Sequence, residues 1–146
     1  MQSLPYADVV LVLEFVIGFS LLAGGWLARK RKFRGHAWCQ SVAVLLNLVV
    51  VAAVMVPSFR AQIIPRIPAK LGKSYVAVAT THATLGGIVE LVALYILLAA
   101  GTKLLPERLR LQRYKLWMRA VLAAWWLALL LGAATYVRWY LPLHFR

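Results

Sequence analysis

Residues 76–100 of the sequence read VAVATTHATLGGIVELVALYILLAA, and their only acidic or basic side chains are His82 and Glu90. This run exceeds the ~20 apolar residues that cross a bilayer as a helix. The run is apolar on every side, which predicts a segment surrounded by lipid or buried inside a helix bundle. A segment in lipid must pair its own backbone groups, which favours a helix over a strand.

Three similar runs accompany it, and the four expected transmembrane helices cover about 9–28, 37–56, 76–100 and 116–140. The composition agrees, because 63% of the 146 residues are hydrophobic and 14% are charged. Soluble domains are about half apolar and a quarter charged. We therefore predict one transmembrane domain over residues 1–146, an all-α integral membrane four-helix bundle in up-down-up-down order.

Basic residues predict the orientation of the bundle. The first and third connectors carry eleven Lys and Arg, and the second connector and the tail carry six. Basic residues collect on the cytoplasmic side, so both termini are expected outside. The segment before the first helix has no basic residue, which favours a retained helix over a cleaved signal peptide. In the outer loop 57–74, Pro57, Pro65 and Pro68 disfavour a long regular helix.

The net charge of +13 would suggest nucleic acid in a soluble protein. Here the charges lie between apolar runs, so anionic lipid headgroups are the expected partners and nucleic acid is not. The single cysteine, Cys39, excludes a disulfide within the chain and any multi-cysteine metal site. We expect it to be an inert small hydrophobic side chain.

Small residues at four-residue spacing predict which helices touch, because they let backbones approach closely in lipid. The third and fourth runs both carry such a stripe, so we expect these two helices to be close neighbours. The stripes are Ala79, Ala83 and Gly87, and Ala124, Ala128 and Gly132.

His82 is the main candidate for a functional site, because ionisable residues inside a membrane are costly. It lies about two turns into the third helix among threonines. A neutral imidazole can be an axial ligand of haem iron or part of a proton or quinone site. The structural alternative is a histidine hydrogen-bonded to a neighbouring threonine or carboxylate.

Two carboxyl groups are further candidates. Glu90 shares a helix face with His82 and should reach the depth of Asn47, with which it could pair. A proton-relay or partner-contact role for Glu90 is the alternative. Glu14 lies at the expected depth of His82, so these two residues could form a polar site in the outer leaflet.

His36 begins the second helix, directly after the first basic connector. It is expected at the cytoplasmic interface, where most histidines are solvated. It lies near the opposite membrane face from His82, so the two should not ligate one haem together. We find no phosphate loop and no nucleophile–base motif in the sequence, which favours a protein that is not an enzyme.

Three stretches resemble a family of small bacterial membrane proteins, the YozB/CtaM type. They are Arg29-Lys30-Arg31-Lys32-Phe33-Arg34-Gly35-His36, then Thr81-His82, and last Arg113-Tyr114-Lys115 with Trp126 and Gly132-Ala133-Ala134-Thr135-Tyr136. The resemblance implies a place in the bacterial cytoplasmic membrane and a link to maturation of cytochrome c oxidase. The family tends to have a histidine where this chain has Tyr114, which marks a divergent member.

The leading hypothesis is a non-catalytic accessory or assembly subunit of a respiratory, cytochrome-oxidase-type complex. His82, Glu14, Glu90 and His36 are the candidate ligand-binding residues, and His82 is the candidate metal ligand. A subunit that carries haem b or handles quinone is the alternative, and a small proton or ion transporter is a further one. A larger membrane complex, anionic lipids and bound lipid are the expected partners.

Overall fold

The computed structural model describes residues 4–70, 72–103, 105–110 and 112–141. Over these residues the chain is helical and has no strand. Four helices are long and apolar enough to cross a membrane, so the predicted class, an all-α multi-pass membrane protein, is confirmed at this level. The longest helices of these four spans are α1 (Leu4–Arg29), α2 (Phe33–Val50), α5 (Ser74–Gly101) and α6 (Tyr114–Trp139).

The second span does not end where the sequence predicted. It continues from α2 through a π-helical segment, η1 (Val51–Met55), into α3 (Val56–Gln62). Pro57 explains the wide turn, because proline has no N–H and its ring crowds the carbonyl four residues before it. The Val56 N–H instead reaches back five residues to the Val51 carbonyl.

The rest of the outer loop holds two short pieces, η2 (Ile64–Arg66) and α4 (Ile67–Lys70). Pro65 and Pro68 start or lie within these pieces, and each piece is one turn or less. The expectation of no long regular helix therefore fails for the first turns of the loop and holds after Gln62.

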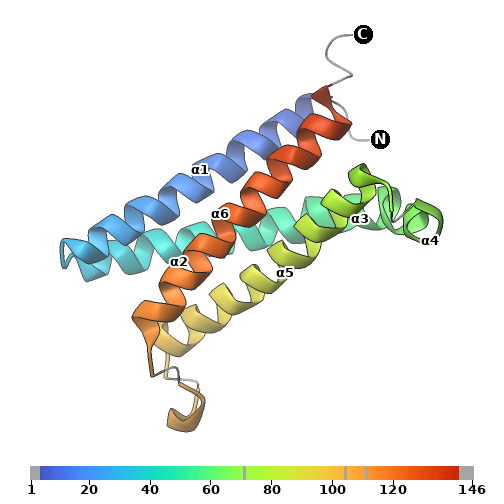
Figure 1. The fold of residues 1–146 in the computed structure, drawn as a ribbon. Coiled ribbons are helices and arrows are strands. Elements are labelled where there is room, and N and C mark those ends of the chain that lie inside the picture. Colours follow the sequence, from blue (N-terminus) through green and yellow to red (C-terminus); the bar gives the residue numbers. More distant parts are fainter. Residues whose placement is uncertain (1–3, 71, 104, 111, 142–146) are drawn as a thin grey trace.

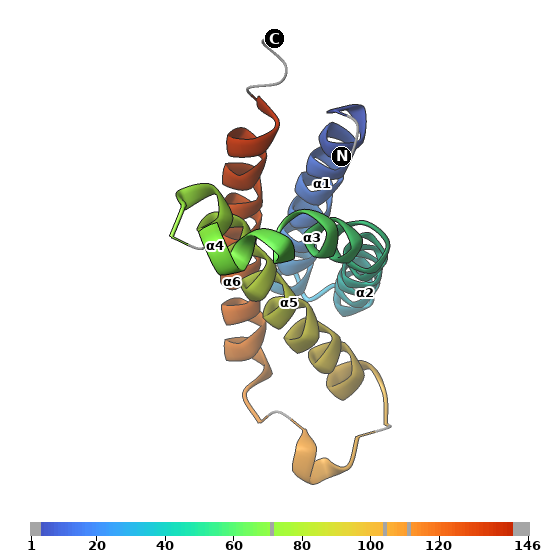
Figure 2. The ribbon, with the colours of Figure 1, turned by 90° about the vertical axis from the view of Figure 1, so that its right-hand side faces the viewer.

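The four long helices form two close pairs, α1 with α2 and α5 with α6 (Figure 1). The predicted contact between the third and fourth spans is confirmed, because α5 and α6 share the most extensive helix contact. The pairs meet through α1 against α6 and, less extensively, through α2 against α5. Figure 2 shows α5 and α6 diverging toward their connector, which contains η3 (Glu107–Leu109).

A buried apolar cluster joins the two pairs near the middle of the bundle. Trp125 of α6 is its largest member and is 4% exposed. The other members are Ile17, Leu21, Ala43, Val44, Val89 and Ala93. All four long helices contribute, so this cluster is the common core of the bundle.

The α1–α2 pair is held by polar side chains as well as by packing. The Cys39 thiol donates to the Ser20 carbonyl over 3.0 Å, and the Gln40 amide donates to the Leu21 carbonyl over 2.9 Å. Cys39 is therefore a hydrogen-bond donor between helices, which corrects its assignment as an inert hydrophobic residue. Gly24 makes room for this contact, because an added Cβ would lie 2.4 Å from the Gln40 amide nitrogen.

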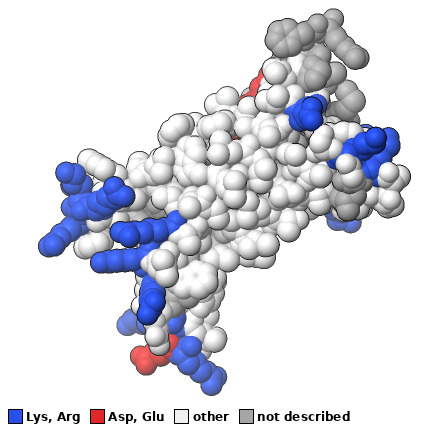
Figure 3. Space-filling model, viewed as in Figure 1, with Lys and Arg blue, Asp and Glu red and all other residues white. Residues whose placement is uncertain are grey.

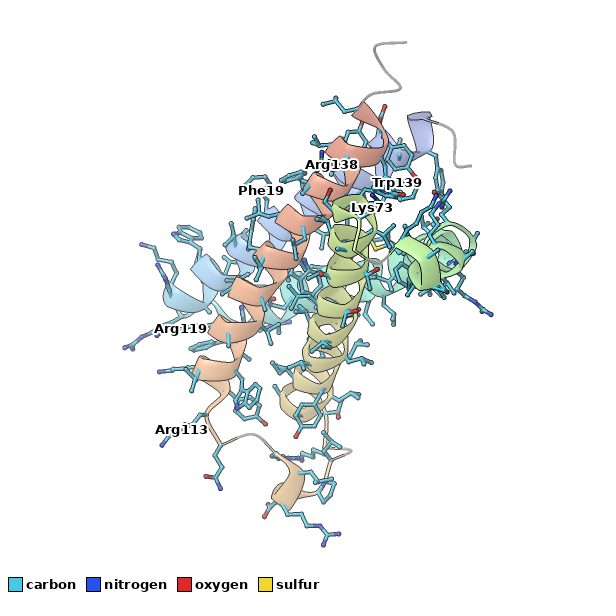
Figure 4. All side chains as sticks on the ribbon, turned by 45° about the vertical axis from the view of Figure 1, so that its right-hand side comes forward. Phe19, Lys73, Arg113, Arg119, Arg138 and Trp139 are labelled. Carbon is cyan, nitrogen blue, oxygen red and sulfur yellow. The ribbon has the colours of Figure 1, made fainter. Side chains whose placement is uncertain are left out.

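Charged side chains gather at the two ends of the bundle and leave its middle uncharged on the face seen in Figure 3. Figure 4 places Arg138 and Trp139 near Lys73 at one end, and Arg113 and Arg119 toward the other. At the first of these ends the Arg138 guanidinium donates to the Ser74 hydroxyl over 2.8 Å. The first residues of α1 and the last of α6 also lie there (Figure 1), and the Tyr136 hydroxyl donates to the Asp8 carboxylate.

Candidate functional site

A cavity of about 410 Å³ lies among the helices, on the side where α2 and α5 are least tightly packed. A second cavity of about 150 Å³ adjoins the same side chains. Both lie in the half of the bundle that contains the start of α1, the end of α6 and the segment η1–α3. The residues that line both are Glu14, Met55, Ser58, His82, Leu129, Thr135 and Tyr140.

His82 lies on α5 with its imidazole against α6. Its Nδ1 is 2.8 Å from the carbonyl oxygen of Ala128. A carbonyl can only accept, so Nδ1 carries the proton and the neutral ring has a bare Nε2. Among the described residues Nε2 has no hydrogen-bond partner, and His82 lines both cavities. The ring is therefore a fixed acceptor or metal ligand at the cavity wall.

Gly132 of α6 leaves the space for this ring. A Cβ added at Gly132 would lie 2.9 Å from Cε1 of His82 and 3.3 Å from Nδ1. Such a contact is too short, so any larger residue would displace the imidazole from its carbonyl partner. Gly132 belongs to the small-residue stripe predicted for helix contact, and here the stripe also positions a functional side chain.

Glu14 reaches the same two cavities from α1. Its Oε1 is buried and has no hydrogen-bond partner within the described part of the chain. The sequence placed Glu14 and His82 at one depth, and the structure brings both to one cavity wall. No hydrogen bond joins the two side chains among the described residues, so the cavity presents them as separate polar groups.

Glu90 pairs with Asn47, as the depth of the two residues predicted. The Asn47 Nδ2 donates to Glu90 Oε2 over 2.8 Å, and both side chains are buried. Glu90 lines neither of the two cavities, whereas Asn47 lines the larger one. The carboxyl group of Glu90 thus supports the cavity wall through Asn47.

His36 lies at the other end of the bundle and takes no part in these cavities. Its Nδ1 is 2.8 Å from the Gly24 carbonyl oxygen, and its side chain is half-buried. The expectation of a merely solvated interfacial histidine is therefore wrong. Its ring joins α1 to α2 beside the bonds of Cys39 and Gln40.

Sequence reasoning missed the contribution of the second span. The π-helical segment η1 brings Val51 and Met55 to the larger cavity, and Ser58 of α3 follows them. Pro57 was the available signal, since a proline inside an apolar run marks a helix with a local distortion. Distortions of this kind are frequent at functional sites.

The donor set fits a haem only in part. His82 offers one imidazole nitrogen, and Met55 offers a thioether in the same cavity, a combination found as axial ligands of haem iron. Among the described residues no group of three or more His, Cys, Asp or Glu side chains could hold a metal ion. The described residues at this cavity therefore supply one strong ligand and one weaker one.

Four aromatic side chains line the larger cavity: Trp125 near the middle of the bundle, and Phe59, Trp139 and Tyr140 toward the outer end. Trp139 is fixed by three contacts: its Nε1 donates to the Tyr75 carbonyl over 3.2 Å, the Tyr75 ring lies 5.7 Å away, and the Arg66 guanidinium lies 5.0 Å from its ring. Tyr140 is hydrogen-bonded to Gln62 of α3. These contacts fix the rings of Trp139 and Tyr140 against α5, η2 and α3.

No family model, no curated protein and no solved structure matches the chain.

Proposed function

We propose that the chain is a non-catalytic accessory or assembly subunit of a respiratory membrane complex of the cytochrome oxidase type. We propose further that it serves the complex by holding a membrane-soluble ligand in the cavity at His82. The observation that carries the proposal is the polar part of this cavity, where Glu14 and His82 line the wall and the described residues leave His82 Nε2 without a partner. Unpaired polar groups within a membrane are costly, and a second molecule would satisfy them.

The surroundings of these groups support ligand binding. The cavity volume of about 410 Å³ lies within the range of small-molecule sites, and most of its lining residues are apolar. The lining includes Met55, Ala79 and Leu129, which suit the tail or ring of a lipid-soluble compound. The buried pair Asn47–Glu90 adjoins the cavity and holds α2 to α5.

The resemblance to the YozB/CtaM-type family adds a link to oxidase maturation. At the position where that family tends to have a histidine, the Tyr114 hydroxyl donates to the Ala99 carbonyl over 3.1 Å and ties the start of α6 to the end of α5. His36 is likewise occupied with Gly24. Both contacts are structural, which agrees with a divergent member whose active region lies at His82.

We place the protein in the bacterial cytoplasmic membrane with both termini outside. The connectors Lys30–Lys32 and 102–113 would then be cytoplasmic, and the cavity would lie in the outer half of the bilayer. The basic residues at the cytoplasmic end would bind anionic lipid headgroups or an acidic surface of the complex.

Purification in a mild detergent tests the accessory role. We expect the tagged chain to travel through a sizing column with a much larger complex that is identified by its oxidase haem spectrum and by its subunits. Deletion of the chain should lower the amount of assembled oxidase in membranes. Isolation of the chain only as a free monomer, with normal oxidase in the deletion strain, would contradict the proposal.

A haem-carrying electron-transfer subunit is the second candidate, and the bare Nε2 of His82 favours it. When bound, haem would supply one-electron redox chemistry, and His82 and Met55 would be the residues that hold it. A reduced-minus-oxidised visible spectrum of the chain stripped of its partners tests this candidate. A haem band that is lost in His82→Ala and kept in His36→Ala would support it, and a colourless wild-type chain would remove it.

A further inference from the structure

We infer that the cavity at His82 binds the hydroquinone form of a membrane quinone in preference to the oxidised quinone. This inference rests on the proposed function, because it names the ligand of the same cavity. It starts from the tautomer of His82, which the Ala128 carbonyl fixes by accepting from Nδ1 at 2.8 Å. Nε2 is then an acceptor, so the ligand atom that faces it must donate a hydrogen bond.

The oxidation states of a quinone differ in this property. A hydroquinone carries two O–H donors, whereas the oxidised ring carries two carbonyl oxygens that only accept. The oxidised form therefore meets the bare Nε2 with a second acceptor and gains no bond there. One hydroxyl of the hydroquinone would donate to His82 Nε2, and Glu14 is the second polar side chain from another helix that lines the same cavity.

The shape and lining of the cavity favour an aromatic headgroup over an aliphatic alcohol. The indole ring of Trp125 lines the larger cavity about one turn along α6 from the Ala128 carbonyl that holds His82, and a flat ring packs well against it. Trp125 is 4% exposed and belongs to the common core, so it offers a rigid wall. The remaining wall is apolar and includes Met55 and Leu129.

An opening in the wall suits the isoprenoid tail. Gly86 and Gly87 of α5 line the cavity, and a Cβ added at either would meet no atom within 4 Å. Thr84 lines the same cavity and is exposed, so the cavity reaches the surface of α5. A tail can leave the bundle here and enter the bilayer while the headgroup stays at His82.

The test uses the full-length chain in phospholipid vesicles without oxygen. The probes are a decyl-tailed benzohydroquinone and the matching benzoquinone, and bound ligand is measured after sedimentation against protein-free vesicles. We expect the wild type to bind the reduced form about three- to tenfold more tightly, the value of roughly one hydrogen bond. The variant His82→Ala should bind both forms equally. The variant His36→Ala is the matched control, because its imidazole makes the same kind of bond to a carbonyl outside the cavity, and it should keep the preference.

The variant Gly87→Leu is a second test, which remains valid even if His82→Ala does not fold. The open space at Gly87 accepts a side chain, so the variant should fold and lose saturable binding of both forms. Equal or tighter binding of the oxidised form by the wild type, an unchanged preference in His82→Ala, or unchanged binding in Gly87→Leu would each overturn the inference. Co-purification with the oxidase-type complex is a separate result: a chain that travels with the complex but binds neither probe loses this inference and keeps the proposed function.

Discussion

The Asn47 amide of α2 donates a hydrogen bond to the Glu90 carboxyl group of α5 over 2.8 Å, within the membrane-spanning part of the bundle. The bond joins α2 to α5, whose contact is less extensive than that between α1 and α6. Asn47 Oδ1 and Glu90 Oε1 are buried without partners among the described residues, so the pair satisfies only half of its own polar atoms. The strength of the contact between α2 and α5 therefore depends on both side chains together.

Replacement of Asn47 by Leu is expected to lower the free energy of unfolding by about 1–3 kcal/mol, because the Glu90 carboxyl group loses its donor. The double variant Asn47→Leu with Glu90→Leu should be more stable than Asn47→Leu alone, since no polar atom of this pair is then left unpaired. The free energy of unfolding of the single and the double variant is measured by unfolding the purified chain in mixed micelles with a denaturing detergent. Leu46→Ala, on the lipid-facing side of α2, serves as the control. Strictly additive effects of the two substitutions would show that the bond contributes nothing.

Replacement of Gly132 by Ala is expected to displace the His82 imidazole, because the new Cβ would lie 2.9 Å from Cε1. Gly87→Ala is the matched control, since its Cβ meets open space. Both variants gain the same helix propensity, so the difference between them isolates the contact. We expect Gly132→Ala to be less stable than Gly87→Ala by about 1 kcal/mol, the value of roughly one hydrogen bond.

Nitrogen NMR of labelled histidine detects the displacement of the His82 imidazole independently of stability. The wild type should show a protonated Nδ1 and a bare Nε2 for His82, and Gly132→Ala should shift both signals. Identical His82 spectra in the two glycine variants would mean that Gly132 does not position the ring.

Replacement of Arg31 by Gly is expected to stabilise the protein by roughly 0.5–1 kcal/mol. Arg31 adopts φ 58° in the short connector between α1 and α2, a left-handed conformation that costs a residue with a Cβ about this much. Lys32→Gly is the control, because Lys32 has φ −85° and glycine relieves no strain there. A stability of Arg31→Gly at or below that of Lys32→Gly would refute the conformational argument.

The proposed orientation predicts a pattern of chemical labelling. In a Cys39→Ala background, a single cysteine at Lys70 should react with a membrane-impermeant maleimide in intact spheroplasts. Single cysteines at Lys30 or Arg108 should react only after the membrane is opened, because the positive-inside rule places both connectors in the cytoplasm. The reverse pattern would invert the bundle and place the cavity in the inner half of the bilayer.

The sequence predicts the four spans well, because the length of an apolar run and the cost of unpaired backbone in lipid leave few alternatives. Depth can be counted along each helix at a constant rise per residue, which is why Asn47 was matched to Glu90 and Glu14 to His82. The small-residue stripes predicted α5 and α6 as a close pair, and the pair is confirmed, although Gly87 of the α5 stripe faces open space at the cavity.

The rotation of each helix about its own axis could not be predicted. Helices that are apolar on all sides carry no strong stripe to show which face turns inward. The sequence therefore left open whether His82 faced a partner or the bundle, and it gave no sign of the Ala128 carbonyl that fixes its tautomer. The extension of the second span past Pro57 is not predictable in the same way, because a proline usually ends a helix, whereas this helix widens to admit it.

The cavity reaches the surface of α5 at Thr84, which is exposed within the membrane-spanning part of the bundle. Occupancy by a lipid-soluble ligand that enters there is governed by the mole fraction of that ligand in the surrounding lipid. Washing with excess detergent dilutes that lipid phase and empties such a site. The native ligand is therefore to be sought in chains extracted with their own annular lipid, before any column is run.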